Sequence, residues 1–278
     1  MSKRKLPIFA TVLAIIGFVL LYLPMFLVVE QSFNASKHGQ SWGGFTLDWY
    51  TGLASNSMVQ TTTVNTLILA VVSTLIATVL GTLLAIGIHR TPWGKKVGYF
   101  YDMSINVPVV TPDILMAIAL VSVFALFRSW TSVFDPGMLT MTIAHVTLEI
   151  SFVVLVVQSR LVSIGKDQIE AARDLYASTA GAWFRVILPQ LSTAIVSGAL
   201  LAFTLSLDDF ILSFFTSGPD SQTLPLYIYG SLKRGVSPQI HALSSIIFGL
   251  TLFVMVLMVL KGIRNERKAL KHSQSPKG

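Results

Sequence analysis

An all-α integral membrane protein is the fold class that this sequence predicts, and three observations predict it. The 278 residues are 53% hydrophobic and only 12% charged, whereas soluble domains carry about 25% charged residues. The apolar residues form six runs that are long enough to cross a bilayer, which takes about 20 residues in a helix. Lys and Arg gather at the ends of these runs. The net charge of +7 therefore reports on membrane topology and does not indicate a nucleic-acid partner.

The six expected spans follow one another without an internal repeat. The first begins after Lys3, Arg4 and Lys5 and is too long for the core of a signal peptide, so we expect it to remain as an anchor. We expect a single transmembrane domain over residues 1–278, with a cytoplasmic loop at 159–190. The expected spans are 9–29, 62–88, 103–127, 138–158, 191–216 and 242–260.

Lysine and arginine predict the orientation of these spans. Sixteen of the 20 such residues lie at the N-terminus, in the loops after the second and fourth spans, and in the tail. The other four are Lys37, Arg128, Lys233 and Arg234. Cytoplasmic loops of membrane proteins are enriched in Lys and Arg, so we expect both termini in the cytoplasm.

Several kinds of chemistry have no support in the sequence. The chain has no cysteine, which excludes disulfides, thiolate metal sites and cysteine nucleophiles. It has no Gly-x-x-x-x-Gly-Lys-Ser/Thr loop, so we do not expect ATP to bind to this chain. The catalytic motifs of intramembrane proteases and a His-Glu-x-x-His motif are also missing. We therefore expect no catalytic residue, metal or cofactor on this chain, and a transport role rather than an enzyme.

The loop at 159–190 is polar, and its pattern predicts two short amphipathic helices. After the capping residues Ser178 and Thr179, apolar side chains recur at i, i+3, i+4 and i+7. They are Ala180, Trp183, Phe184 and Ile187. A shorter apolar face precedes them, with charged residues opposite. Such a segment either docks on a partner or lies on lipid headgroups, and its mixed charge favours docking.

Four carboxylates lie inside the expected spans, where an ionised side chain costs about 2.5–3.5 kcal/mol even on a lenient scale. They are Asp113, Glu149, Asp208 and Asp209. No Lys or Arg lies inside any expected span, so these acids predict a path for a cationic substrate. We expect His145, one turn before Glu149, to bond it rather than to bind a ligand.

Asp208 and Asp209 are neighbours and point about 100° apart on a helix. One of them can line the path while the other pairs internally or with Lys233 or Arg234. Aromatic faces also suit cations, which adds Tyr227 and Tyr229, although such residues commonly lie at the membrane interface. Pro108 and Pro112 can break the third span, either as a plain kink or as part of a binding site.

The motifs of the loop resemble those of a known family. The runs 170–172, 174–175 and 187–189 are similar to the EAA loop of ABC importer permeases. This resemblance implies that the loop docks on a cytoplasmic ATPase through Glu170, Ala171, Ala172, Asp174, Leu188 and Pro189. In one respect the chain departs from the pattern, because Tyr176 stands where the family usually has glycine.

Further motifs resemble the membrane subunits of spermidine/putrescine ABC importers. They are 32–34, 112–114, 203–209, 217–219, 224–226 and 235–238. The resemblance implies a type I ABC importer-like permease that crosses the bacterial inner membrane several times. It also implies a cytoplasmic ATPase dimer that carries the ATP, a second and related permease subunit, and an extracytoplasmic substrate-binding protein.

The substrate that this resemblance implies is a polyamine of the putrescine and spermidine class. The residues expected along its path are Asp113, Glu149, Asp208, Asp209 and Tyr227. Two alternatives stay open on the sequence alone. One is an ABC permease for another cationic solute, and the other is an ion-coupled secondary carrier or channel.

Overall fold

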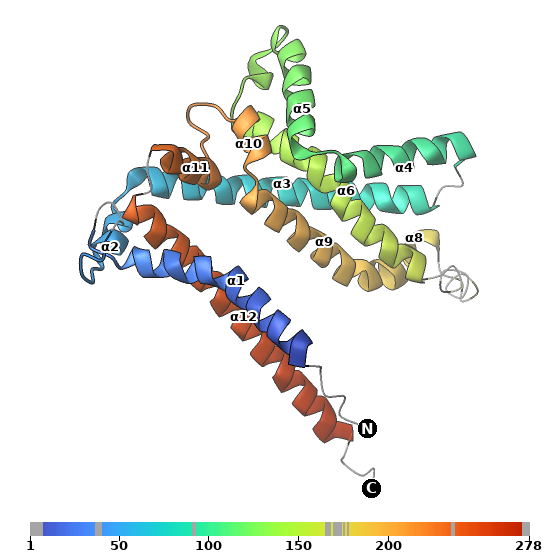
Figure 1. The fold of residues 1–278 in the computed structure, drawn as a ribbon. Helices are drawn as coiled ribbons and strands as arrows, with labels where there is room; N and C mark the ends of the chain where they lie inside the picture. Colours follow the sequence, from blue (N-terminus) through green and yellow to red (C-terminus); the bar gives the residue numbers. More distant parts are fainter. Residues whose placement is uncertain are drawn as a thin grey trace. The chain divides into compact units, whose positions relative to one another are not determined.

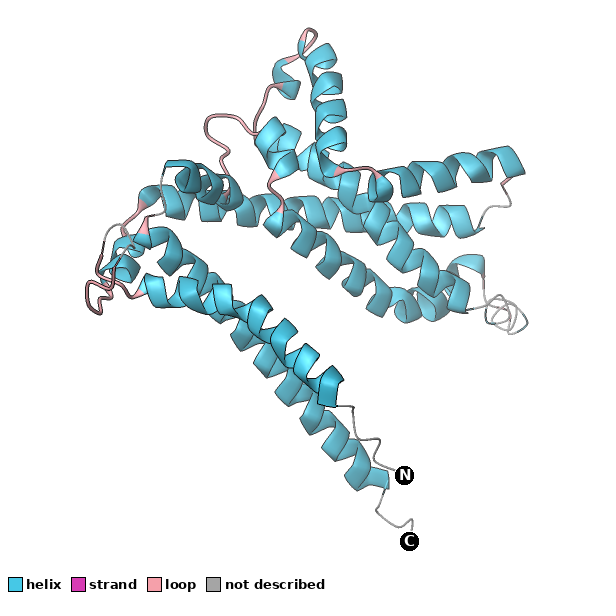
Figure 2. Ribbon diagram, viewed as in Figure 1, coloured by secondary structure: helices cyan, strands magenta, loops and turns pink. Residues whose placement is uncertain are grey.

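The computed structural model confirms the all-α prediction for the residues that it describes. These are 8–36, 41–90, 93–164, 168, 174, 176, 178–234 and 237–273. Every regular element in them is a helix (Figure 2), and the one β-contact is an isolated bridge between Asn34 and Phe45. In the order of the chain (Figure 1) the helices are α1 (Ile8–Ser32), α2 (Asp48–Ala54), α3 (Ser57–Arg90), α4 (Lys95–Val110), α5 (Asp113–Arg128), η1 (Ser132–Phe134), α6 (Met138–Ile164), α8 (Thr179–Ala182), η2 (Trp183–Ile187), α9 (Leu188–Asp208), α10 (Ile211–Thr216), α11 (Leu224–Arg234) and α12 (Pro238–Ser273).

Four stretches of helix among the described residues are long and apolar enough to cross a membrane. They are α1, α3, α6 and the continuous η2–α9 segment Trp183–Asp208. The pair α4 and α5 counts as a fifth span if the two are taken together, although they meet at an angle of 114°. In α12 the described apolar part, Pro238–Phe253, is shorter than a span. The protein therefore crosses the membrane several times.

Two of the expected spans are interrupted. The span expected at 103–127 breaks at 111–112, where Thr111 has extended backbone angles and Pro112 precedes α5. Proline disfavours helical angles in the residue before it, which explains the break there. Pro108 lies inside α4 without ending it. The span expected at 191–216 breaks at 209–210, between α9 and α10.

The contacts divide the chain into two compact units, residues 1–57 with 228–278, and residues 58–227. In the first unit, α1 and α2 both pack against α12. Its loop after α1 is organised by Asn34, which is fully buried. The Asn34 side chain bonds the side chain of Gln31, the carbonyl of Ser41 and the amides of Ser36 and Gly43.

The second unit is centred on the pair α6 and α9. Their buried side chains form one apolar core with residues of α3 and α4. The helix α4 packs on α6, and α5 packs on α10. A second, smaller core joins α5, α6 and α10 through Ala117, Phe124, Ala144 and Leu212. This unit contains all five residues that we expected along the path, and the described part of the coupling loop.

Glycine permits the close approach of α3 to α6. A Cβ atom built on Gly81 would lie 2.8 Å from the Cβ of Val153, whereas one built on Gly198 of α9 would lie 3.5 Å from the Cα of the same residue. Small residues at such positions let membrane helices pack closely.

We predict that Gly81→Ala destabilises the protein and that Gly198→Ala does not. Overpacking of this kind costs about 1–3 kcal/mol, because Val153 and the backbone of α6 must move, whereas the second variant makes an ordinary contact. Thermal unfolding of the two purified variants in the same detergent measures the difference. Equal melting temperatures would contradict the close helix packing described here.

Candidate functional site

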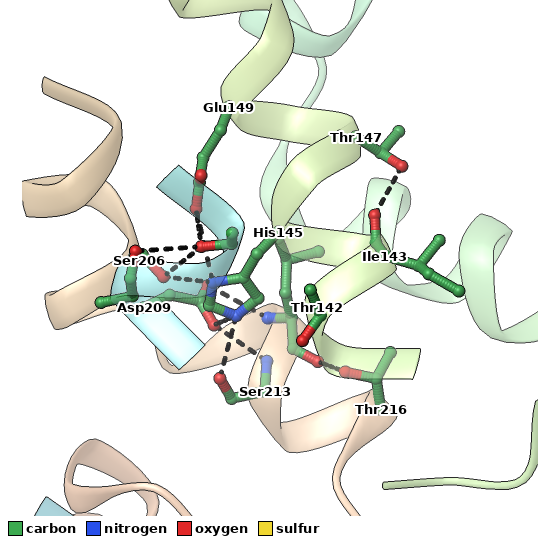
Figure 3. Close-up of polar contacts among 12 residues, drawn as sticks. Thr142, Ile143, His145, Thr147, Glu149, Ser206, Asp209, Ser213 and Thr216 are labelled. Carbon is green, nitrogen blue, oxygen red and sulfur yellow. Dashed lines mark hydrogen bonds and ion pairs between the residues drawn. The ribbon is translucent and has the colours of Figure 1, made fainter. Parts of the chain in front are cut away.

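A buried polar cluster joins α3, α6, α9 and α10 within the second unit (Figure 3). His145 and Glu149 lie one turn apart on α6, and each is only 1% exposed. Ser73 of α3, Ser206 of α9 and Ser213 of α10 are buried around them. The sequence analysis identified the two α6 residues but missed all three serines.

The serines connect Glu149 to His145 by a chain of hydrogen bonds. The hydroxyl of Ser73 donates to Glu149 Oε1 at 2.8 Å and lies 3.2 Å from Ser206 Oγ. Ser206 Oγ in turn lies 2.8 Å from His145 Nδ1. The direct distance between His145 Nδ1 and Glu149 Oε1 is 3.8 Å, which is too long for a hydrogen bond. The expected contact between these two residues is therefore mostly indirect, and Glu149 Oε2 has no hydrogen-bond partner among the described residues.

Asp209 lies at the break between α9 and α10 and caps the second helix. Its backbone is extended, with φ −63° and ψ 128°. Its carboxylate accepts from the amides of Leu212, at 3.2 Å, and Ser213, at 2.8 Å. These amides are among those that a helix N-terminus leaves without a partner. His145 Nε2 lies 3.3 Å from Asp209 Oδ2, so a histidine of α6 also faces this carboxylate.

Asp208 is the last residue of α9 and lies in a different environment. Its side chain is exposed, whereas that of Asp209 is only 11% exposed. No described Lys or Arg forms an ion pair with either carboxylate. Lys233 lies over the ring of Tyr229 instead, 4.7 Å from its centroid. The side chain of Arg234 falls outside the described residues.

Asp113 and Tyr227 lie on other elements. Asp113 is the first residue of α5, directly after the break, and its side chain is exposed. A negative charge at a helix N-terminus interacts favourably with the helix dipole. Tyr227 is half-buried on α11, and its backbone amide donates to the carbonyl of Thr223.

The expected coupling residues are described only in part. Glu170, Ala171 and Ala172 lie outside the described residues, and Asp174 is exposed. Leu188 begins α9 and is half-buried, and the exposed Pro189 follows in the first turn. Because η2 and α9 form one continuous helical segment, Pro189 lies inside that segment and has no amide hydrogen to donate to the preceding turn.

The helix expected around 180–187 is present, but the prediction that Phe184 lies on its apolar face is wrong. Ile187 is buried in the core shared with α6, and Trp183 packs against that core. Phe184, which we expected on the same face, is 71% exposed. Residues Trp183–Ile187 form a π-helical turn, whose wider spacing shifts the positions that share a face.

Tyr176 has a positive φ of 59°, the left-handed region that favours glycine. Its side chain is 99% exposed. Permeases with an EAA loop usually have glycine at this position. The backbone of Tyr176 therefore has an angle that glycine adopts at no steric cost.

Comparisons with known proteins show which family this architecture belongs to. The family model "Binding-protein-dependent transport system inner membrane component" matches residues 77–264. The putrescine transport system permease protein PotI of Escherichia coli (strain K12) is 36% identical over 241 residues, covering 86% of this chain and 85% of that protein. The spermidine/putrescine transport system permease protein PotC of the same strain is also 36% identical, over 85% of this chain and 87% of that protein.

A solved structure shares the fold. It is a crystal structure of a bacterial alginate ABC transporter in complex with an alginate pentasaccharide-bound periplasmic protein. One of its chains superposes with a TM-score of 0.70 at 18% identity, covering 90% of this chain and 91% of that chain. The resemblance to spermidine/putrescine permeases is confirmed by the two relatives, which are transport proteins and not enzymes. This chain belongs to the family of binding-protein-dependent transport system inner membrane components.

Proposed function

We propose that this chain is a permease subunit of an ATP-driven importer that moves a polyamine of the putrescine and spermidine class into the cytoplasm. The observation that carries the proposal is the 36% identity to a putrescine permease over 86% of the chain. A similarity of this extent covers the membrane helices and the loops together. The intramembrane carboxylates, which suit a cation, support the same substrate class.

In this proposal the chain lies in the bacterial inner membrane, crosses it six times and has both termini in the cytoplasm. Its fold is that of a type I ABC importer-like permease. The distribution of Lys and Arg supports the orientation. For six spans, α4 with α5 and α9 with α10 each count as one broken span, and α12 is the sixth.

The polyamine path would run beside the two helix breaks. Asp113 and Asp208 each lie at a break and are exposed, so they are the carboxylates that a linear cation would contact first. Broken helices often mark binding sites in transporters. Glu149 and Asp209 would contribute negative charge from inside the polar cluster, and Tyr227 an aromatic face.

Coupling to ATP would pass through the loop at 159–190. A cytoplasmic ATPase dimer would bind Glu170, Ala171, Ala172 and Asp174, and the motion would enter the membrane at Leu188 and Pro189. The packing of η2 and α9 on α6 supports this route, because Ile187 and Leu191 belong to one core with Leu161. A push on the loop would then move α6 and α9 together as one body.

An ATP-driven importer of this kind needs further partners. ATP would bind to the ATPase and not to this chain, which we propose carries no cofactor. A second, related permease subunit would complete the path. An extracytoplasmic binding protein would deliver the substrate, as the periplasmic protein bound to the alginate transporter suggests by analogy.

The test of this function is transport by the native complex. The complex is purified from membranes through a tag on this chain and reconstituted into liposomes with the binding protein that accompanies it. We predict uptake of radiolabelled putrescine or spermidine that requires ATP and is insensitive to ionophores. Uptake of another cation alone would favour a different ABC permease. Uptake that follows an ion gradient without ATP would favour a secondary carrier or channel.

We predict that Glu170→Lys uncouples transport without loss of membrane insertion, because a reversed charge would disturb docking on the ATPase. The expected result is at least a tenfold lower rate of ATP-dependent uptake, for the loss of about one charged contact, at an unchanged amount of protein in the membrane. Asp48→Lys, at an exposed residue of α2, is the charge-matched control. Unaltered uptake by Glu170→Lys would contradict the docking role.

We predict that Tyr176→Gly keeps full transport and stabilises the loop. A residue other than glycine in the left-handed region costs about 1–2 kcal/mol, and glycine removes that cost. Tyr176→Val should lower both uptake and protease resistance of the loop, because a β-branched residue fits this angle poorly. Limited proteolysis of the two variants, alongside uptake, measures the effect. Equal behaviour of the Gly and Val variants would contradict the requirement for a positive φ.

A further inference from the structure

His145 makes contacts on both sides of the break between α9 and α10. We propose that His145 is a positioning residue, which clamps this break to α6 and holds the Asp209 carboxylate inside the protein. One part of the inference rests on the proposed function. This part is that Asp208, and not Asp209, is the aspartate that a substrate cation can reach. The clamp itself concerns contacts within this chain (Figure 3).

The two ring nitrogens of His145 reach different helices. Nδ1 lies 2.8 Å from the hydroxyl of Ser206, which is on α9 before the break. Nε2 lies 3.3 Å from Asp209 Oδ2 and 3.2 Å from the hydroxyl of Ser213, which is on α10 after the break. One side chain of α6 therefore bridges two helices that are otherwise joined by Asp209, whose backbone is extended, and Phe210.

The hydrogens of the cluster can be assigned from its geometry. The proton of Ser73 goes to Glu149 Oε1, so the contact between Ser73 and Ser206 needs the proton of Ser206. Ser206 then has none left for His145, and Nδ1 must donate to it. If Nε2 also carries a hydrogen, it donates to Asp209. On this side of the ring the hydroxyl of Ser213 also lies within hydrogen-bond distance of Nε2.

Glu149 on α6 and Asp209 at the break are the described acidic groups that face the His145 ring, and Ser73 of α3 adds no charge. An ionised carboxylate in a low-dielectric interior needs a counter-charge and donors. Asp209 has two backbone amides and one ring nitrogen as donors, so it has little capacity left for a substrate ammonium group. Asp208, one residue earlier, is exposed.

The clamp also fixes elements beyond the break. Leu212 of α10 is buried in the core that contains Ala117 and Phe124 of α5. If the clamp opens, the N-terminal end of α10 loses its polar contacts with α6, while the bond from Thr140 to the carbonyl of Thr216 remains at the other end. The helix α5 packs on α10 and carries Asp113 at its N-terminus, so it would shift with α10. His145 would thus determine where two candidate contact residues lie, without touching the substrate.

Two substitutions separate a clamp from a residue that only fills space. In His145→Gln the amide nitrogen reaches the place of Nε2 and can donate to Asp209. His145→Leu keeps most of the volume and removes all hydrogen bonds. His89→Gln, at an exposed histidine of α3, is the matched control.

The substrate-independent measurement is a distance across the break. Because the chain has no cysteine, Leu200→Cys on α9 and Phe214→Cys on α10 introduce two unique sites for spin labels in the intact complex. We expect a narrow distance distribution in the parent and in His145→Gln, and a broadened or shifted one in His145→Leu. Identical distributions in the parent and in His145→Leu would overturn the clamp, whatever the substrate is.

Transport by the unlabelled variants tests the consequence for the substrate. We expect His145→Gln to stay within about threefold of the parent in the ratio of maximal uptake rate to KM, and His145→Leu to lose about 10- to 100-fold, the effect of one buried charge-assisted hydrogen bond. The loss should shrink when Asp209→Asn is already present, since the clamp has then lost its charged partner.

Equal losses in the Gln and Leu variants, or additive losses with Asp209→Asn, would overturn the inference. Failure of the parent to import any polyamine would instead refute the proposed function and leave the distance result to decide on the clamp.

Discussion

Inside a bilayer a polar side chain has no water to bond, so Glu149 and His145 must find their partners within the protein. They find them on three other helices, through Ser73, Ser206 and Ser213. This requirement fixes more than the two side chains. It holds α3, α9 and α10 at one level of α6, and the close packing of Gly81 on Val153 continues the same contact between α3 and α6.

The same requirement accounts for the interrupted helices. A break in a membrane helix frees backbone amides and carbonyls, which are costly in hydrocarbon unless other groups bond them. At the break after α9 the carboxylate of Asp209 bonds two of the freed amides. These capping bonds and the contact with His145 together account for its buried position. Asp208 caps no helix among the described residues and is exposed, so we propose that one aspartate stabilises the fold while its neighbour contacts the substrate.

Much of this architecture could be predicted from the sequence, because long apolar runs and the distribution of Lys and Arg are strong signals. The membrane class, the helix after Ser178 and the importance of Glu149 and His145 came from such signals. The serines of the cluster could not be predicted, since a small hydroxyl residue in a membrane helix usually bonds its own backbone. The exposure of Phe184 was missed because a π-helical turn changes the spacing that a regular helix predicts. The left-handed angle of Tyr176 had a signal only in the glycine that the family usually has there.

The most direct test of the polar cluster is a crosslink between its two helix-bridging serines. In the cysteine-free chain, Ser73→Cys and Ser206→Cys place two thiols where hydroxyl oxygens lie 3.2 Å apart, within reach of a disulfide. In the assembled transporter, a membrane-permeable oxidant should form an intramolecular disulfide in the double variant, and mass spectrometry of the linked peptides would detect it. Single-cysteine variants should give none. A neighbouring exposed pair of cysteines serves as the control for oxidation. If that pair is fully oxidised and the linked peptides are absent, α3 and α9 do not contact each other at this site.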